Sequence, residues 1–323
     1  MSAAREDWDR ELDERAAPSP LLQTWGWGNV QSHAGWTIER VRLASGAMAS
    51  VQLRGLGPVR EAYVPRGPVP ATPEAIIALV DWSRRAKIAR ITIEPEAPPA
   101  FGSVMREQGF TPAPAVQPQH TRILKLAPAA EMLATFKHGR RYNIRAGERR
   151  GVLVEEGKDA AELERQSEAV ERRESIHLPA RSYYQLLLDE LPWSRTYIAR
   201  HPQTHEALSA VLVARNAGRA YHLFAGRSGA YPELMGNDLA WWAAIKAAAE
   251  DGCRDYDLWG VPPPGAGPDH PWHGLGFFKA EFGGEEDAFA GAWELVLSQT
   301  ASRLLGLEKR ARGRVRGLKR NIS

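Results

Sequence analysis

Alternating apolar and polar side chains predict three short strands near the start of the chain. Residues 36–43, 48–53 and 60–64 alternate in this way, and glycines punctuate the segments between them. Short strands joined by turns pair most simply as an antiparallel meander. The first part of the chain is therefore predicted to build a small antiparallel sheet.

Apolar positions then change to helical spacing. Thr72 is a predicted N-cap, and Pro73 suits the first position of a helix. Apolar residues between Ile76 and Val80 supply one face of that helix, and residues 90–94 predict the strand that follows. The first half is thus expected to end in a β-α-β unit.

The same order of elements recurs in the second half. The predicted elements are strand 207–215, strand 219–225, helix 239–250 and strand 255–259. A turn at residues 216–218 joins the two strands as a hairpin, Asn237 or Asp238 caps the helix, and Gly252 ends it. The repeated order indicates two related α/β halves.

A basic segment lies between the halves. Residues 137–150, KHGRRYNIRAGERR, are predicted to be helical, and Lys137, Arg141, Arg145 and Arg149 recur every four residues. On a helix this spacing forms one cationic ridge, although like charges so placed repel each other. The ridge is either a solvated face paired with acids elsewhere or a surface for a polyanion.

Composition narrows the class of protein. The 323 residues are 43% apolar and 25% charged, which is ordinary for a globular protein and excludes collagen-like, coiled-coil and disordered classes. The one cysteine, Cys253, can form neither an internal disulfide nor a thiolate zinc site. Because the nine histidines are scattered along the chain, no metal site is expected.

The sequence also bears on localisation. The first twenty residues are charged and lack an apolar core, so we expect no secretory signal peptide. No segment approaches the roughly 18 to 20 apolar residues that a membrane-spanning helix needs. These features predict a cytoplasmic protein.

Positive charge is concentrated near the carboxyl terminus. Residues 309–320, KRARGRVRGLKR, contain seven Lys or Arg and no acid, and removing these cations from the net charge of +3 leaves −4. Such a segment, which includes Arg312 and Arg314, suits RNA phosphates or the inner, anionic face of a membrane. A solubilising tail is the alternative.

Several ordered motifs resemble those of the FemABX family, aminoacyltransferases that add amino acids from charged tRNA to the peptide of a peptidoglycan precursor. The motifs are LQTWGWG (22–28), YVPRGPV (63–69), RYNIR (141–145) and GLGFFKAEFGG (274–284). The resemblance covers most of the chain, and several motifs in order are far more specific than one short pattern.

The resemblance implies an α/β fold of two tandem GNAT-like domains with mixed sheets. It places domain 1 at residues 1–127 plus 298–323 and domain 2 at residues 128–297. Some family members carry a long coiled-coil arm in the second domain. No sustained heptad of that length is present here, which indicates the compact type.

The resemblance makes Lys279 the expected catalytic residue. Acyl transfer from an ester to an amine passes through a tetrahedral intermediate whose oxygen becomes negative, and a fixed ammonium stabilises that oxygen selectively. Without the surrounding motif, a lysine beside Phe277 and Phe278 would be expected to reach the surface. Phe278 is expected to line the cavity for the adenosine end of tRNA, where an aromatic ring can stack on a base.

The resemblance also implies a site for the peptidoglycan precursor. Arg181 and Tyr183, in the segment ARSYYQLL, match the family's arginine–tyrosine pair. Arginine offers a two-pronged donor to phosphate, and tyrosine adds a hydroxyl and a flat ring for a sugar. Both residues are therefore expected to bind the precursor.

Three further positions of the expected precursor site depart from the family pattern. Gln31 stands where a lysine is expected, so its phosphate contact is either lost or supplied by Arg66, and Phe224 replaces a tyrosine. Glu94, in place of an aspartate, either orients the attacking amine or is an ordinary solvated carboxylate. No protein base is required, because a phosphate or ribose hydroxyl of the substrates can accept the proton.

The expected partners follow from the same resemblance. They are aminoacyl-tRNA, bound by the cationic ridge together with Arg312 and Arg314, and a lipid-linked or UDP-linked peptidoglycan precursor. The basic tail adds contact with an anionic membrane surface as a further expectation. No cofactor is implied.

Two other functions compete with this interpretation. Residues 215–220, RNAGRA, fit the loose Arg-x-x-Gly-x-Ala phosphate loop of acetyl-CoA-dependent N-acyltransferases, but the next residues predict a strand where such a loop opens a helix. A non-catalytic RNA- or membrane-binding protein would use the ridge and the tail and would not need Lys279.

Overall fold

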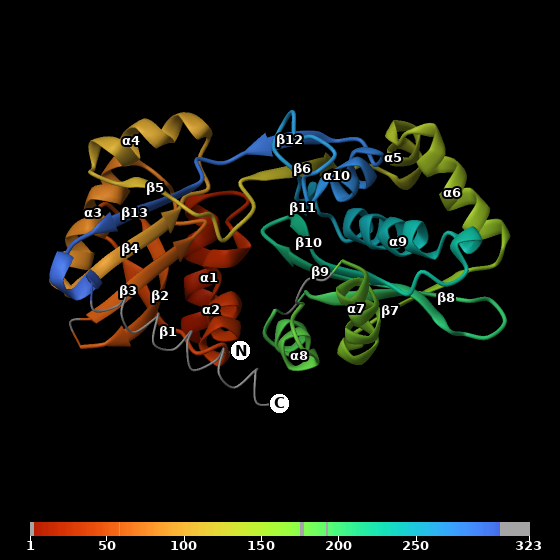
Figure 1. Ribbon diagram of the computed structural model, residues 1–323, viewed down its shortest axis with the longest axis horizontal. Helices are drawn as coiled ribbons and strands as arrows, with labels where there is room; N and C mark the ends of the chain where they lie inside the picture. Colours follow the sequence, from red (N-terminus) through yellow and green to blue (C-terminus); the bar gives the residue numbers. More distant parts are fainter. Residues whose placement is uncertain (1–2, 58, 175–177, 192, 304–323) are drawn as a thin grey trace. The chain divides into compact units, whose positions relative to one another are not determined.

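The computed structural model describes residues 3–57, 59–174, 178–191 and 193–303. The chain forms two compact units (Figure 1). Unit 1 combines residues up to Gln119 with those from Phe289 onward, and unit 2 runs from His120 to Ala288. The domain limits inferred from the family resemblance, after residue 127 and before residue 298, stay a prediction.

Unit 1 is built on a mixed sheet of six described strands. In spatial order they are β1 (Thr37–Arg42), β2 (Met48–Leu56), β3 (Val59–Pro65), β4 (Ile88–Glu94), β13 (Ala292–Val296) and β5 (Thr111–Ala113). The first three pair antiparallel, and β3 pairs parallel with β4. The predicted meander and the predicted β-α-β unit are both confirmed.

The helices of unit 1 follow local signals in the sequence. They are α1 (Ala3–Arg15), α2 (Trp25–His33), α3 (Pro73–Arg85) and α4 (Gly102–Glu107), with short 3-10 turns η1 (Leu21–Gln23) and η2 (Pro99–Phe101). Thr72 caps α3 as predicted, since its hydroxyl accepts a hydrogen bond from the Ala75 amide at 3.2 Å. Ile76 and Leu79 of α3 are fully buried in the core over the sheet.

Unit 2 contains a second mixed sheet. Its described strands, in spatial order, are β12 (Glu285–Ala288), β6 (His120–Lys125), β11 (Asp255–Gly260), β10 (Arg219–Arg227), β9 (Ala207–Asn216), β8 (Arg195–Arg200) and β7 (Leu153–Gly157). Strands β10 and β11 are parallel, and the other neighbours are antiparallel. The order hairpin, helix, parallel strand therefore recurs as predicted.

The turn between β9 and β10 is a two-residue hairpin turn. Ala217 and Gly218 both have positive φ, 48° and 79°, as turns that match the twist of paired strands require. The segment that follows is strand β10, so the Arg-x-x-Gly-x-Ala pattern does not open a helix. This geometry argues against a coenzyme A phosphate loop at residues 215–220.

Helices cover both faces of the unit 2 sheet. They are α5 (Ala129–Thr135), α6 (His138–Arg149), α7 (Ala160–Glu174), α8 (Arg181–Glu190), the short η3 (Pro232–Leu234), α9 (Gly236–Glu250) and α10 (His273–Ala280). Figure 1 shows α9 on one side of the sheet and α7 on the other. The α/β class with two mixed sheets is confirmed.

The predicted cap of α9 was wrong. The helix begins at Gly236 after Met235, which lies in the left-handed region with φ 56°, so Asn237 and Asp238 fall inside the first turn. Asn237 instead accepts a hydrogen bond from the Ser209 hydroxyl at 3.0 Å. Asn237 and Asp238 therefore bind residues distant in sequence, Ser209 and Arg140, instead of capping the helix.

Candidate functional site

Lys279 lies in the last turn of α10 and is buried, with 4% of its surface exposed. Its Nζ donates a hydrogen bond to the Gly260 carbonyl oxygen, 2.6 Å away, at the end of β11. Burial lowers the pKa of Lys279 to about 7, against the opposing charge of Asp257. The amine is therefore fixed in place and poised between its charged and neutral forms near neutral pH.

An aromatic cluster surrounds this turn of α10. The Trp241 ring lies edge-on to the ring of Phe278 at 5.1 Å and stacks on that of Phe282 at 5.7 Å. Phe282 is fully buried, whereas Phe278 is half-buried. Phe278 directly precedes Lys279 in the chain, and part of its ring is packed against the core.

A buried histidine belongs to the same cluster. The His222 ring stacks on Trp241 with centroids 3.5 Å apart, and its Nδ1 lies 3.0 Å from the Tyr256 hydroxyl. Burial, and secondarily the charge of Lys279, lower the pKa of His222 well below its ordinary value. Within the described residues its Nε2 has no hydrogen-bond partner. His222 is therefore a neutral imidazole inside the core.

A β-bulge gives β10 two different functional faces. Side chains two apart on a regular strand lie on the same face, yet His222 contacts α9 while Phe224 contacts α8. The register of β10 against β9 shifts between these two residues. The extra residue, Leu223, turns Phe224 to the opposite face from His222.

The predicted precursor-binding residues of unit 2 gather around Phe224. The rings of Tyr183 and Tyr184 lie edge-on to Phe224, with centroids at 6.3 Å and 5.0 Å. Tyr184 is fully buried, and Tyr183 is half-buried. Arg181 is exposed at the first position of α8. The structure therefore brings Tyr183 and Phe224 together and leaves the Arg181 side chain exposed to solvent.

Two predicted residues lie in unit 1, and both are buried. Arg66 has positive φ, 53°, and its guanidinium lies 3.8 Å from the centre of the Phe289 ring while Nη2 donates to the Pro118 carbonyl oxygen at 2.6 Å. Glu94 accepts hydrogen bonds from the Tyr63 hydroxyl and from the Val116 amide, the latter at 2.6 Å. Glu94 is thus no solvated carboxylate.

The cationic ridge is only partly helical. Lys137 precedes α6 as its N-cap residue, and Arg141, Arg145 and Arg149 lie on the helix. The Arg141 guanidinium donates to the Phe136 carbonyl oxygen, which ties it to the turn before α6. Lys137, Arg145 and Arg149 are exposed. Arg312 and Arg314 lie outside the described residues.

Sequence reasoning missed Arg140, the residue next to the ridge. Its side chain is 2% exposed and forms ion pairs with Asp238 and Glu281. Helical spacing could have revealed this, because Arg140 shares one face of α6 with Ile144 and Gly147, four and seven residues later. The pattern of basic residues drew attention to the opposite, solvated face.

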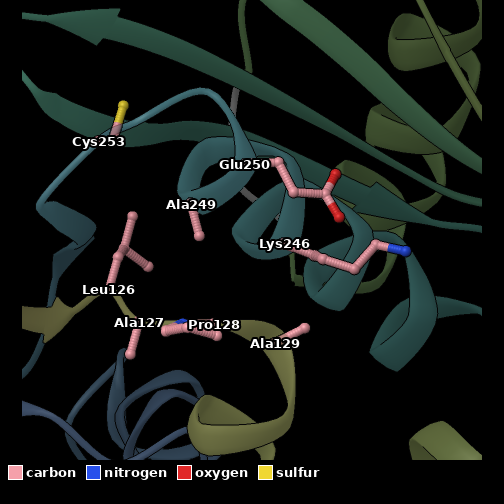
Figure 2. Close-up of a pocket in the computed structure, with 8 residues that line it drawn as sticks. All are labelled: Leu126, Ala127, Pro128, Ala129, Lys246, Ala249, Glu250 and Cys253. Carbon is pink, nitrogen blue, oxygen red and sulfur yellow. The ribbon is translucent and has the colours of Figure 1, made fainter.

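The described surface also has two shallow hollows that contain none of the predicted site residues. The hollow in Figure 2, about 260 Å³, is lined by Leu126, Ala127, Pro128, Ala129, Lys246, Ala249, Glu250 and Cys253. Figure 2 shows Lys246 and Glu250 on helix α9, across from the segment 126–129. A second hollow of about 240 Å³ lies beside Trp193 and Arg215. Neither hollow includes Lys279.

The described residues contain neither a metal-binding cluster nor a membrane-spanning helix. No group of three or more His, Cys, Asp or Glu side chains is arranged there to hold a metal ion. None of the helices in that part of the chain is both long and apolar enough to cross a membrane.

Comparison with known proteins gives a family match for part of the chain and a fold for nearly all of it. A model of the FemAB family matches residues 190–307, the segment that contains Lys279. The crystal structure of FemX superposes with a TM-score of 0.82 at 18% identity, covering 94% of this chain and 99% of that one. None of the curated proteins matches.

More distant folds are also similar. L-PGS from Bacillus licheniformis superposes with a TM-score of 0.56 at 13% identity, covering 96% of each chain. A tandem GNAT protein from the clavulanic acid biosynthesis pathway gives 0.50 at 15% identity, covering 91% of this chain and 96% of that one. These likenesses show that each unit is GNAT-like. The segment around Lys279 thus matches the FemAB family, and the chain as a whole has the fold of FemX.

Proposed function

We propose that the protein transfers an aminoacyl group from aminoacyl-tRNA to the side-chain amine of a peptidoglycan stem peptide, building the interpeptide bridge. The observation that carries this proposal is the buried amine of Lys279, fixed against the Gly260 carbonyl within the segment that the FemAB model matches. A lysine held in this way has lost the side-chain freedom of a surface lysine. Its position suits stabilisation of a developing charge.

The chemistry requires one new bond and one broken bond. The amine nitrogen attacks the ester carbonyl carbon, the C–N bond forms, and the carbonyl oxygen becomes an alkoxide. As the alkoxide collapses, the C–O bond to the ribose breaks, and the ribose oxygen takes a proton that the nitrogen has lost. Because the ester is already activated, positioning and stabilisation of the alkoxide supply the acceleration.

Lys279 is assigned to the alkoxide. Its ammonium, in a low-dielectric setting beside Phe278, favours the negative oxygen of the intermediate over the neutral ester. Phe278 is assigned to the adenosine end of the tRNA, on the part of its ring that the aromatic cluster leaves exposed. The exposed ridge residues Lys137, Arg145 and Arg149 are assigned to the tRNA backbone.

The sugar and diphosphate of the acceptor, as distinct from its reacting amine, are assigned to the aromatic group on the other face of β10. Tyr183 and Phe224 offer ring surfaces for a sugar, and the exposed Arg181 offers a two-pronged donor for the diphosphate. Arg66 and Glu94 of unit 1 are proposed as further substrate contacts. Their present hydrogen bonds leave them less capacity for a ligand than exposed side chains would have.

A transfer assay tests the proposal. The protein is incubated with a pool of charged tRNA and with either a lipid-linked or a UDP-linked precursor, and the mass added to the muropeptide identifies the amino acid. Lys279→Met is expected to lower kcat by about 10²- to 10³-fold while tRNA affinity stays nearly unchanged. Lys246→Met, at an exposed lysine of the same unit, is the matched control and should transfer normally.

Three outcomes would contradict this function. Full activity of Lys279→Met would remove the catalytic assignment. Acyl transfer that needs acetyl-CoA in place of charged tRNA would favour the N-acyltransferase alternative. Binding of tRNA or anionic vesicles with no transfer by the unmodified protein would favour the non-catalytic alternative.

A further inference from the structure

Arg140 connects three helices around the candidate catalytic residue. It is the third residue of α6, and its side chain is almost fully buried. Nη1 donates to Asp238 of α9, and Nη2 donates to the Phe278 carbonyl oxygen of α10 at 3.2 Å. The same Nη2 lies 3.1 Å from a carboxylate oxygen of Glu281. One guanidinium thus joins α6, α9 and the end of α10.

The contacts of Arg140 bracket Lys279 along the chain. Phe278 directly precedes the lysine, and Glu281 follows it by two residues. The Glu281 backbone carbonyl also accepts a hydrogen bond from the Lys137 amide at 2.9 Å, at the start of α6. The last turn of α10 is therefore held from both sides of the lysine by the first turn of α6.

The flat face of the guanidinium adds an aromatic contact. Its central carbon lies 4.0 Å from the centre of the Phe278 ring and 4.5 Å from that of Phe282. A planar delocalised cation can stack on rings and donate in several directions at once, which the point charge of a lysine cannot do. The arrangement therefore requires arginine, and a cation of another shape would not reproduce it.

Stability alone is a weak explanation for this group. Burying an arginine with two carboxylates carries a large desolvation cost, and apolar replacements of such groups are often neutral or stabilising. Burial lowers the pKa of Arg140, because removal from water destabilises its charged form. The charges of Asp238 and Glu281 oppose this shift. What the charged Arg140 provides, and an apolar side chain would not, is a fixed geometry at the end of α10.

We propose that Arg140 is a positioning residue that aligns the Phe278–Lys279 pair for acyl transfer by clamping the last turn of α10. This inference rests on the proposed aminoacyl transfer. Arg140 itself is buried beneath the pair and acts on the reaction through Lys279.

A double-mutant cycle tests the proposal. Arg140→Lys is expected to lower kcat about tenfold and to change KM by less than about twofold, because the turn that holds Lys279 loses its fixed geometry. In the Lys279→Met background the same change should lower the residual rate by less than about twofold, since the amine whose position affects kcat is no longer present. Equal losses in both backgrounds, or a loss confined to KM, would overturn the proposal.

Matched variants separate positioning from general loss of structure. Arg215→Lys changes another arginine of unit 2 that pairs with an acid, Asp251, and lies near an aromatic ring, Trp193. It should leave kcat unchanged. If Arg140→Lys does not fold, Glu281→Gln keeps the side-chain volume, removes one ion pair of Arg140 and should show a smaller kcat loss with the same dependence on Lys279.

A measurement without turnover keeps this inference distinct from the proposed function. In NMR spectra of the protein labelled with ¹³C-lysine, the resonance that is missing in Lys279→Met is that of Lys279. In the unmodified protein this resonance should titrate near pH 7. In Arg140→Lys its pKa should rise toward that of an exposed lysine, whereas Arg215→Lys should leave it in place. An unchanged titration in Arg140→Lys overturns the positioning role, whereas a shift in a protein without transfer activity overturns only the proposed function.

Discussion

The side chain of Lys279 combines two properties that oppose each other. Burial favours the neutral amine and lowers its pKa to about 7, while stabilisation of an alkoxide requires the ammonium. The two forms are therefore close in free energy near neutral pH, and the rate of the proposed reaction should depend on which form predominates.

The pH dependence of kcat/KM checks this conclusion. Because the pKa of Lys279 in the free enzyme is lowered, the active ammonium is lost as pH rises through about 7. At pH values well above this pKa, kcat/KM should decrease about tenfold for each further pH unit. The residual kcat/KM of Lys279→Met should lack this falling limb. A falling limb that persists in Lys279→Met would assign the titration to another group, such as the acceptor amine or tRNA.

The sequence predicted individual site residues well where a motif contains them. It could not predict the environment of a side chain that is set by contacts with distant parts of the chain. The motif GFFKAEF singled out Lys279, but no local pattern showed that Gly260 would accept its hydrogen bond. Glu94 ends strand β4 as predicted, yet its burial depends on the Tyr63 hydroxyl and on amides about twenty residues later. Such contacts join segments that only the folded chain brings together.

Elements were predicted well when their signals were local. Alternation located β1 to β3, and the Thr72–Pro73 pair located the start of α3. The β-bulge at Leu223 gave no such signal, because one extra residue in a strand changes register without changing composition. It nevertheless decides that His222 faces the aromatic cluster around Lys279 while Phe224 faces the predicted acceptor residues.

Helix α6 has a buried basic residue, Arg140, and exposed basic residues that are assigned to tRNA. The exposed residues lead to a prediction about tRNA binding. Reversing the charges of Arg145 and Arg149 to Glu should weaken tRNA binding and make its dependence on salt shallower, because fewer counterions are released. Arg84→Glu with Arg85→Glu, at two exposed arginines of α3, changes the net charge by the same amount and should have a smaller effect. Equal effects of the two reversals, in binding measured at several salt concentrations, would show that only net charge matters.

At the scale of the whole chain, charge is distributed very unevenly. Seven cations between residues 309 and 320 exceed the net charge of +3, so the rest of the protein is acidic on balance. Electrostatic attraction of any large anion therefore depends strongly on this segment.

Charge reversal in the tail tests that dependence. Arg312→Glu with Arg314→Glu should reduce association with tRNA or with anionic vesicles and flatten its salt dependence, and vesicles of zwitterionic lipid provide the control. If the variant binds only one of these two anions less tightly, that anion is the partner of the tail. Unchanged association with both would leave the tail as a spacer.

The position of β13 has a consequence for how the protein is made. This strand, Ala292–Val296, lies between β4 and β5 and pairs with both, although the whole of unit 2 separates it from them in sequence. During synthesis, all strands of unit 2 have left the ribosome before β13 emerges. The inserted unit can therefore complete its sheet on the nascent chain first, while the amino-terminal unit waits for its last inner strand.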